Sequence, residues 1–201
     1  ADVPYGGFAG VGGGGGIAVT GMWRGIIGLE LQLFVTSESA KGTLTNRDNG
    51  TKTTLNLDQS SWHLPLVLKL ALPAGIVRPH AIIGFDFIFP GDPELEMSPA
   101  PLNANQFRAE SDSYTALRFG FGLEFVLPIK DVDIRIPLNF AGNYNYGLND
   151  NLENDRLRLD CNPTALSLLT TAADSSQCLF TYGTQWKWQA QISLGVAYYF
   201  L

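Results

Sequence analysis

Apolar and polar side chains alternate along much of this chain, and a period of two predicts β-strands. The clearest example is Trp186–Phe200, where Trp, Ala, Ile, Leu, Val, Tyr and Phe fill one face and mostly polar or small residues fill the other. This run is about 15 residues long, whereas strands of soluble sheets usually have about 5–6. A tilted strand needs about 9–11 residues to cross a membrane, so the length favours a membrane-spanning strand.

Six further segments carry the same alternation, so seven strands are predicted. They are the glycine-rich Tyr5–Thr20, followed by Trp23–Val35, Trp62–Leu72, Ala81–Phe89, Leu117–Leu127 and Ile134–Phe140. One face is almost purely Leu, Ile, Val, Phe and Trp, and the other carries charges of both signs. We interpret the apolar face as lipid-facing, which predicts an all-β, antiparallel up-and-down transmembrane β-barrel, with residues 1–201 as a single domain. The alternative is a soluble β-sandwich or a lipocalin-like barrel with the apolar face inside.

The number of strands raises a difficulty for this interpretation. Bacterial single-chain membrane barrels have an even number of strands, whereas the pattern predicts seven. An open sheet would leave unpaired backbone groups in lipid, which is costly. We therefore expect about eight strands, with the first one upstream of Ala1. A strand hidden in the glycine-rich segment and a strand lent by another chain are the alternatives, and a closed seven-stranded barrel would contradict the expectation.

The predicted connections alternate in length, as they do in outer-membrane barrels, which have short periplasmic turns and long extracellular loops. Tight turns are predicted at Thr20–Gly21, Pro73–Gly75 and Lys130–Asp131, and long polar loops at Ser37–Ser61, Pro90–Ser113 and Gly147–Thr181. Three prolines argue against the strands that contain them, because proline cannot donate to a ladder. We expect local bulges to accommodate Pro65, Pro79 and Pro137.

Composition and cysteine content narrow the class of protein. Charged residues make up 16% of the 201 residues, compared with about 25% in soluble domains. The net charge of −6 argues against a nucleic-acid partner. Cys161 and Cys178 flank a polar segment without a nearby histidine, so a disulfide is the simplest interpretation and zinc is disfavoured.

Three segments resemble a known family. Trp62–Lys69 reads Trp-His-Leu-Pro-Leu-Val-Leu-Lys, Arg78–Gly84 reads Arg-Pro-His-Ala-Ile-Ile-Gly, and the chain closes on Tyr198-Tyr199-Phe200-Leu201. They resemble strands and the C-terminal aromatic signal of the small OmpA-like outer-membrane β-barrel domain family, from which the chain departs in ending on Leu201. The resemblance covers most of the chain from about Tyr5 onward. It implies the fold and a bacterial outer-membrane location, and the family has no common enzymatic activity to carry over.

Two sets of residues are candidates for a site. The first should point into the lumen as a salt-bridged polar plug: Arg24, Glu30, Lys69, Arg78, Asp86, Arg118, Glu124, Asp133, Arg135 and Lys187. The second should lie at the membrane interfaces, where aromatic girdles form: Trp23, Trp62, Trp186, Trp188, Tyr198 and Phe200. An eight-stranded barrel is just wide enough for side chains to fill it, which favours the plug. A narrow path for ions or solutes through the lumen is the alternative.

Other candidates have simpler explanations. His63 and His80 fall on the polar face, and a Ser61–His63 nucleophile pair is the arrangement that an enzyme would use. The acidic segments Gly91–Met97 and Asn149–Asp155 match no calcium-loop spacing, so we expect solvated surface. The Gly12–Gly16 run lacks the residues of a phosphate loop. No catalytic residue, metal or cofactor is expected.

We therefore expect a non-enzymatic outer-membrane barrel that acts as a structural or surface-interaction protein. Its expected partners are outer-membrane lipid and another protein that binds the extracellular loops, among them the loop between Cys161 and Cys178. A narrow channel or transporter for small solutes is the second hypothesis, and a lipid-modifying barrel enzyme is the third.

Overall fold

The computed structural model describes residues 9–45, 52–72, 75–98, 107–129, 132–146, 157–161, 178–183 and 186–199. Its strands are β1 Ala9–Trp23, β2 Ile27–Thr45, β3 Lys52–Ala71, β4 Val77–Pro90, β5 Glu94–Ser98, β6 Phe107–Glu110, β7 Tyr114–Ile129, β8 Val132–Tyr144, β9 Leu157–Cys161, β10 Cys178–Gly183, β11 Trp188–Leu194 and β12 Ala197–Tyr199. The all-β class is confirmed for these residues, and each of the seven predicted segments contributes a strand. Within the described residues, no helix is long and apolar enough to span a membrane.

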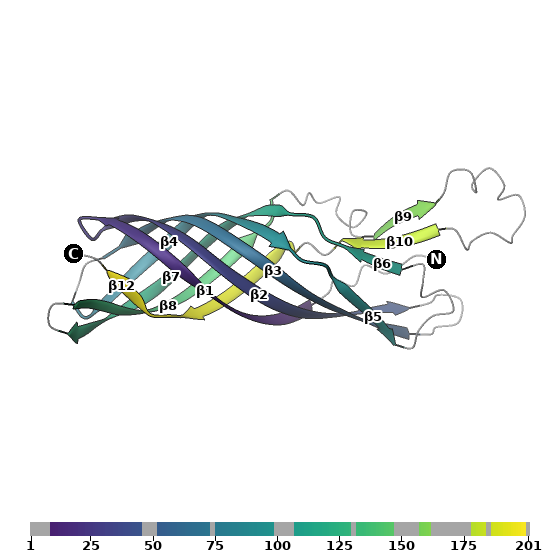
Figure 1. The fold of residues 1–201 in the computed structure, drawn as a ribbon, viewed down its shortest axis with the longest axis horizontal. Coiled ribbons are helices and arrows are strands. Elements are labelled where there is room, and N and C mark those ends of the chain that lie inside the picture. Colours follow the sequence, from purple (N-terminus) through teal and green to yellow (C-terminus); the bar gives the residue numbers. More distant parts are fainter. Residues whose placement is uncertain are drawn as a thin grey trace, which may run out of the picture.

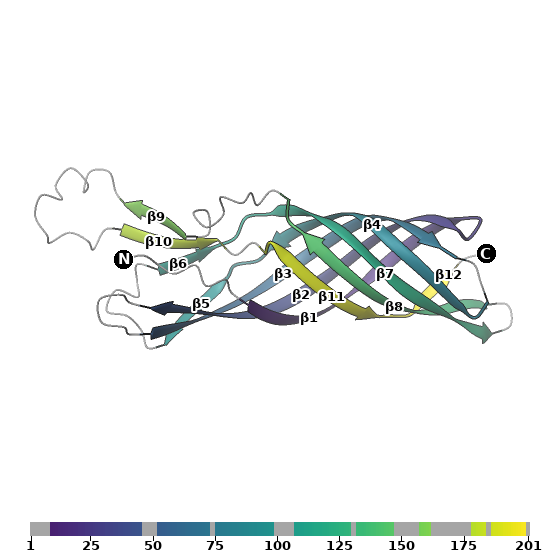
Figure 2. The same cartoon turned by 180° about the vertical axis from the view of Figure 1, so that it is seen from behind.

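Nine strands form one antiparallel sheet that coils about its long axis (Figures 1 and 2). The pairing order is β1-β2-β3-β4-β7-β8-β11. β5 continues the path of β4 along β3, and β12 continues the path of β11 along β8, so the sheet has seven strand paths. Within the described residues β1 and β11 do not pair with each other. The sheet is therefore open, and the closed seven-stranded barrel that would have contradicted the predicted strand count is not formed.

β2 and β3 are longer than the alternation predicted. The expected loop Ser37–Ser61 is mostly a continuation of this hairpin, which stays in one register to Thr45↔Lys52. β5 adds a third strand to the extension. We call this end of the sheet the extended end and the opposite end, where β1 turns into β2, the turn end.

A bulge separates β4 from β5. Ser61 pairs with Pro90 and Asp58 pairs with Glu94, so one extra residue stands between the two pairs on the β4–β5 side. The side-chain amide of Gln59 donates to the Gly91 carbonyl, and the backbone amide of Gly91 donates to the Ser60 carbonyl. An extra residue reverses the faces of a strand, so the side chains of β5 that face outward are its glutamates.

The three strand prolines are accommodated mainly without the expected bulges. Pairing of β2 with β3 skips Leu64 and Pro65 but resumes in the same register, from Leu31↔Leu66 to Phe34↔His63. Pro137 lies opposite the break between β11 and β12, and its carbonyl accepts from the Gly195 amide. Pro79 keeps its pairing with Leu123. A missing donor therefore interrupts a ladder without shifting it.

The first turn lies four residues later than predicted. Thr20 and Gly21 are inside β1, and the chain reverses at Arg24–Gly25. Both residues have positive φ, 53° and 67°, and the Ile26 amide donates to the Trp23 carbonyl. Because Trp23 pairs with Ile27, the hairpin loop has three residues, and its two positive φ values are the kind that a tight hairpin turn needs. Residues 73–74 and 130–131, where the other tight turns were predicted, lie outside the described residues.

A second, three-stranded sheet lies beyond the extended end, in the order β6-β10-β9 (Figure 1). β10 pairs with β6 in parallel and with β9 in antiparallel, so this sheet departs from the purely antiparallel prediction. Its strands come from the predicted loops Pro90–Ser113 and Gly147–Thr181. Its backbone register places Cys161 directly opposite Cys178.

Candidate functional site: a polar interior

Charged side chains occupy the inside of the curved sheet, and large apolar side chains occupy its outside. Asp86 is 0% exposed, Glu124 1% and Lys69 3%. In contrast, leucines and phenylalanines of the alternate positions are largely exposed, such as Leu68 at 42% and Phe121 at 65%. Within the described part of the chain, the buried apolar residues that form a core cluster are Val67, Ile82 and Ala141. This distribution is the reverse of a soluble domain, in which apolar side chains are inside and unpaired charges are outside.

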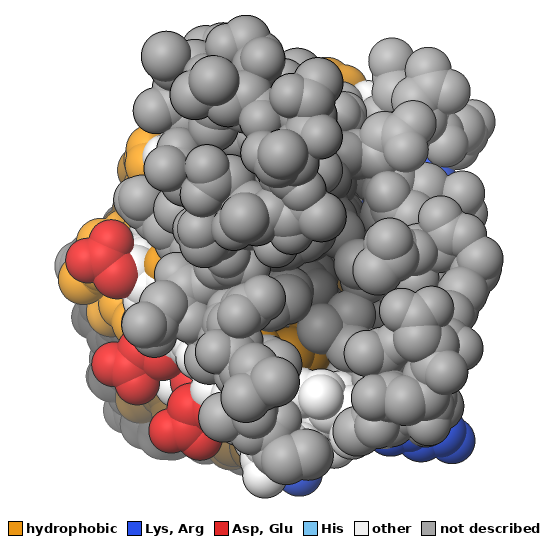
Figure 3. All heavy atoms as spheres, turned by 90° about the vertical axis from the view of Figure 1, so that its right-hand side faces the viewer, with side chains coloured by type: hydrophobic (Ala, Val, Ile, Leu, Met, Phe, Trp, Pro, Cys, Tyr) orange, Lys and Arg blue, Asp and Glu red, His pale blue; other side chains and the backbone are white. Residues whose placement is uncertain are grey.

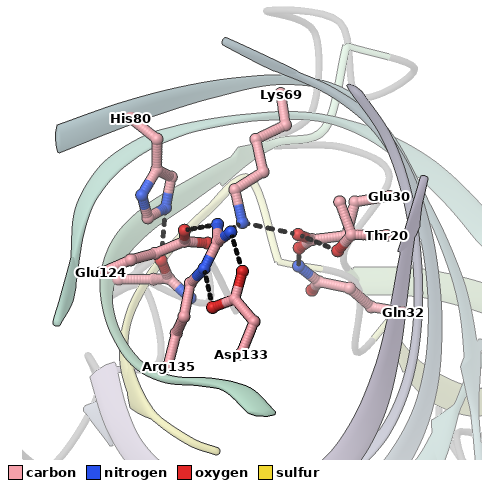
Figure 4. Close-up of polar contacts among 9 residues, drawn as sticks. Thr20, Glu30, Gln32, Lys69, His80, Glu124, Asp133 and Arg135 are labelled. Carbon is pink, nitrogen blue, oxygen red and sulfur yellow. Dashed lines mark hydrogen bonds and ion pairs between the residues drawn. The ribbon is translucent and has the colours of Figure 1, made fainter. Parts of the chain in front are cut away.

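Five charged residues near the turn end form one connected group, which we call the turn-end cluster (Figure 4). Lys69 Nζ lies 3.0 Å from Glu30 Oε2 and 2.6 Å from Glu124 Oε1. Arg135 then joins Glu124 at 3.0 Å to Asp133 at 2.6 Å. Each cation thus contacts two carboxylates, which is the pairing that buried charges require.

The strands bring this cluster together because each member occupies an inward position on a different part of the sheet. Glu30 comes from β2, Lys69 from β3, Glu124 from β7, and Asp133 and Arg135 from β8. Next to this cluster, Gly122 on β7 makes room for a contact between His80 and Asn139. A Cβ at Gly122 would lie 2.7 Å from the ring of His80 and 2.5 Å from Asn139 Oδ1, and these two side chains hydrogen-bond at 2.7 Å.

A second group lies farther toward the extended end and is centred on Asp86, so we call it the Asp86 cluster. Asp86 Oδ2 lies 3.0 Å from His63 Nδ1 and 3.6 Å from Arg118 Nη1, and it accepts a hydrogen bond of 2.8 Å from Asn143. The ring of Phe34 stacks on His63, with centroids 4.5 Å apart, and the Arg118 guanidinium lies 5.3 Å from the Phe34 centroid. Charge pairing and ring packing therefore fix these side chains together.

Gln32 connects the two clusters. Its amide donates to Glu30, and its carbonyl oxygen accepts from Arg118 at 3.4 Å. Arg118 also donates to Gln191 at 2.9 Å. The polar contacts consequently run without a break from Asp133 near the turn end to the Asp86 cluster. Uncharged inward residues such as Gln32 were not among the predicted site residues, although the same period of two identifies them.

His63 contacts a hydroxyl group other than the predicted one. Its Nε2 lies 3.2 Å from Thr36 Oγ1, whereas Ser61 is the residue opposite Thr36 in the ladder. Thr36, His63 and Asp86 thus follow the hydroxyl–imidazole–carboxylate order of a nucleophile relay. However, the Thr36 hydroxyl donates its one proton to Glu38 Oε1 at 3.2 Å. A hydroxyl engaged in this way cannot also donate to His63, which opposes activation of Thr36.

The remaining predicted interior residues differ in placement. The prediction for Arg24 was wrong, because this residue is exposed in the β1–β2 turn, with its guanidinium 4.8 Å from the Trp23 ring centroid. Arg78 is half-buried and pairs in register with Glu124. Lys187 is half-buried, and its carbonyl accepts from the Asn145 amide. The other seven lie inside the curved sheet as predicted.

The outward face changes from apolar to polar along single strands. On the turn-end side of β3, the exposed residues are Trp62 and the leucines from Leu66 onward, whereas Asp58 and Ser60 are exposed on the other side. The outward face of β2 also changes from apolar to polar after Val35, the residue that pairs with Trp62. Beyond it the buried face becomes apolar, with Leu55 and Leu57 buried and pairing with Met97 and Leu95. The extension is therefore built like a sheet of a water-soluble protein.

Aromatic residues stand at both ends of the apolar region. Trp62 marks its limit on β3, and Trp188 contacts Tyr144 with ring centroids 4.5 Å apart at the start of β11. Trp23 is exposed at the turn end. Trp186 is half-buried, only the backbone of Tyr198 is described, and Phe200 lies outside the described residues. The structure thus places the first three at the ends of the apolar region, and the interfacial girdles stay a prediction.

Acidic side chains gather at one margin of the extended end (Figure 3). The predicted loop Gly91–Met97 contains strand β5, on which Glu94 and Glu96 are exposed, and Glu94 pairs with Asp58. Among the described residues, no group of three His, Cys, Asp or Glu side chains could hold a metal ion. Residues 149–155, the other acidic segment, lie outside the described residues, and the disulfide stays a prediction.

Comparison with protein-family models, with curated proteins and with solved structures gave no match. The resemblance to small OmpA-like barrels therefore stays a prediction, and function must be inferred from the residues and their geometry.

Proposed function

We propose that this protein is a non-enzymatic β-barrel of the bacterial outer membrane, with about eight strands and a lumen filled by polar side chains. The observation that carries the proposal is the inverted burial, with ion pairs inside the sheet and leucines and phenylalanines outside. Soluble monomers rarely expose apolar patches larger than a few hundred Å² to water. An apolar outer surface of this extent therefore favours the hydrocarbon of a lipid bilayer as its surroundings.

The length of the apolar region also supports a bilayer as the surroundings. It extends from Trp62 on β3 to Leu72, the residue just after this strand, which is about the 9–11 residues that a tilted membrane strand needs. The polar outer face beyond Trp62 would then lie in water outside the cell, together with β5 and the second sheet. We propose that the protein has a structural or surface-interaction role. The apolar region contacts lipid in the bilayer, and the part outside the cell contacts another protein.

Labelling from within the bilayer tests the proposal. A carbene reagent dissolved in the lipid and activated by light should modify β3 at Leu64, Leu66, Leu68 and Leu70, because their side chains face hydrocarbon. It should leave the same face of the extension, at Thr54 and Asp58, unmodified. Mass spectrometry of the peptides would map the labels. Equal labelling of both halves, or of neither half, would contradict the membrane assignment.

A narrow channel for small solutes is the second candidate, favoured by the unbroken line of polar groups through the interior. Filling and pairing of these side chains favour a closed plug instead. We expect the purified protein to show no steady open conductance in a planar bilayer. A stable conducting level would favour the channel. A lipid-modifying enzyme is the third candidate, and the donation from Thr36 to Glu38 weighs against it.

A further inference from the structure

The two edge strands of the main sheet leave a gap that has the properties of one missing strand. β1 pairs only with β2, and β11 and β12 pair only with β8, among the described residues. An edge of this length in lipid would leave a row of backbone donors and acceptors without partners, at several kcal/mol each. A bilayer-spanning sheet therefore needs these edges to be covered.

Strand direction determines what can cover them. Six antiparallel pairings separate β1 from β11 along the sheet, so the two edge strands run in the same direction. Direct closure of β1 on β11 would make a parallel pair in an otherwise antiparallel sheet. Closure with a second copy of this sheet would make two such pairs. Antiparallel closure requires an odd number of additional strands that run against both edges.

Side-chain exposure locates the gap independently of backbone pairing. Every described residue of β1 from Gly10 to Val19 is exposed, including the inward positions, whereas inward residues of β3 are mostly buried. Outward residues of the edges are also more exposed than those of inner strands. Val11 and Leu194 are 84% and 74% exposed, compared with 47% for Leu31. Each edge thus lacks a neighbour on its free side.

The width of the interior limits the number of added strands to one. Gln189 on β11 donates to Glu38 on β2 across the gap side of the interior, at 3.1 Å. Arg118 on β7 likewise donates to Gln32 on β2, three strands away along the sheet, at 3.4 Å. Side chains span an eight-stranded barrel in this way, and wider barrels leave an open cavity.

We propose that a single strand preceding β1 in the same polypeptide fills this gap, antiparallel to both β1 and β11; this rests on the proposed membrane location. Strands adjacent in sequence are neighbours in space about two-thirds of the time, and β1 is the edge with the larger uncovered surface. The strand alternates apolar residues toward lipid with polar residues toward the interior. Its inward side chains lie over Gly12, Gly14 and Gly16, which contribute none of their own, and offer a donor to the unpaired Oε2 of Glu38.

Cysteine pairs across the gap test the proposal in the full-length protein in its native membrane, with Cys161→Ser and Cys178→Ser as background. Strands two positions apart in a sheet are separated by about 9–10 Å, beyond the about 7 Å that a disulfide can bridge. We expect no disulfide between Val19→Cys or Ile17→Cys on β1 and Ile192→Cys or Leu194→Cys on β11. The control pair Val19→Cys and Leu31→Cys, directly opposite in the β1–β2 ladder, should form one.

A photoreactive amino acid at Val19 then identifies the neighbour. The expected product joins Val19 to a peptide upstream of β1 within the same molecule. An intramolecular disulfide across the gap would show seven-stranded closure, and an intermolecular one would show closure by a second copy. A photoproduct with a downstream peptide or another protein would overturn the assigned source, and failure of the control pair would overturn the β1 edge itself. Lipid labelling of β3 is unaffected by these outcomes, so failure of the membrane assignment remains distinguishable.

Discussion

Arginine in place of Leu66 is expected to lower the free energy of unfolding by about 2–4 kcal/mol, the range measured for Arg and Lys at the midplane of membrane barrels. Leu66 is 40% exposed and lies near the middle of the apolar stretch of β3. A soluble protein would tolerate this change, because water hydrates an exposed guanidinium. In a bilayer the same group must leave water or distort the lipid. Urea unfolding from lipid vesicles measures the difference.

The matched control is Thr54→Arg, on the same strand and the same face. Thr54 is exposed in the polar extension, where a surface substitution should change stability by no more than about 0.5 kcal/mol. The contrast between the two variants separates position along the strand from the intrinsic effect of arginine. Equal, small effects at positions 66 and 54 would place both in water and contradict the lipid-facing assignment.

The outward-facing apolar rows could be read from sequence because they are strongly constrained. Each outward position between Trp62 and Leu70 is Trp or Leu, and each position between them points inward. A side-chain period of two leaves one choice of face once a single residue is placed. The seven strands were therefore identifiable without knowledge of their partners.

The extension of β2 and β3 was missed because its outer face is polar and resembles a loop. Serine, threonine and charged residues dominate Ser37–Ser61, and only Leu55 and Leu57 retain an alternating apolar signal. That signal has the opposite phase to the leucines that follow, since the apolar side there is the inner one. A change of phase within one continuous strand indicates a change of solvent, and could have revealed the extension.

The partners within the interior could not be predicted from sequence. In the ladders Lys69 stands beside Ile82, and Ile82 stands beside Gly120, whereas Glu124 lies four residues farther along β7. The contact between Lys69 and Glu124 arises because long side chains reach across the strongly coiled sheet. Alternation determines which side chains point inward, but tilt and coiling determine which of them meet. The prediction for Arg24 was wrong for a simpler reason, because the turn between β1 and β2 was expected four residues too early.

The most damaging interior substitution is expected to be Asp86→Asn, which should lower the free energy of unfolding by about 3–5 kcal/mol, as for a buried ion pair that loses one partner. Among the described residues, Asp86 is the carboxylate within ion-pair distance of Arg118. The substitution keeps the volume and removes the charge. Within the described residues, Arg118 then retains the amide oxygens of Gln32, Asn143 and Gln191 and the ring of Phe34, none of which carries a negative charge to neutralise a buried cation.

Glu124→Gln provides the comparison, because it also removes a buried carboxylate charge. Here Lys69 keeps Glu30 and Arg135 keeps Asp133, so both cations retain an anion. We therefore expect a smaller loss than for Asp86→Asn, and almost none for Glu94→Gln on the exposed face of β5. Denaturant titration of the three variants gives the order directly. Equal losses for Asp86→Asn and Glu94→Gln would mean that the interior is hydrated, which would favour the channel over the plug.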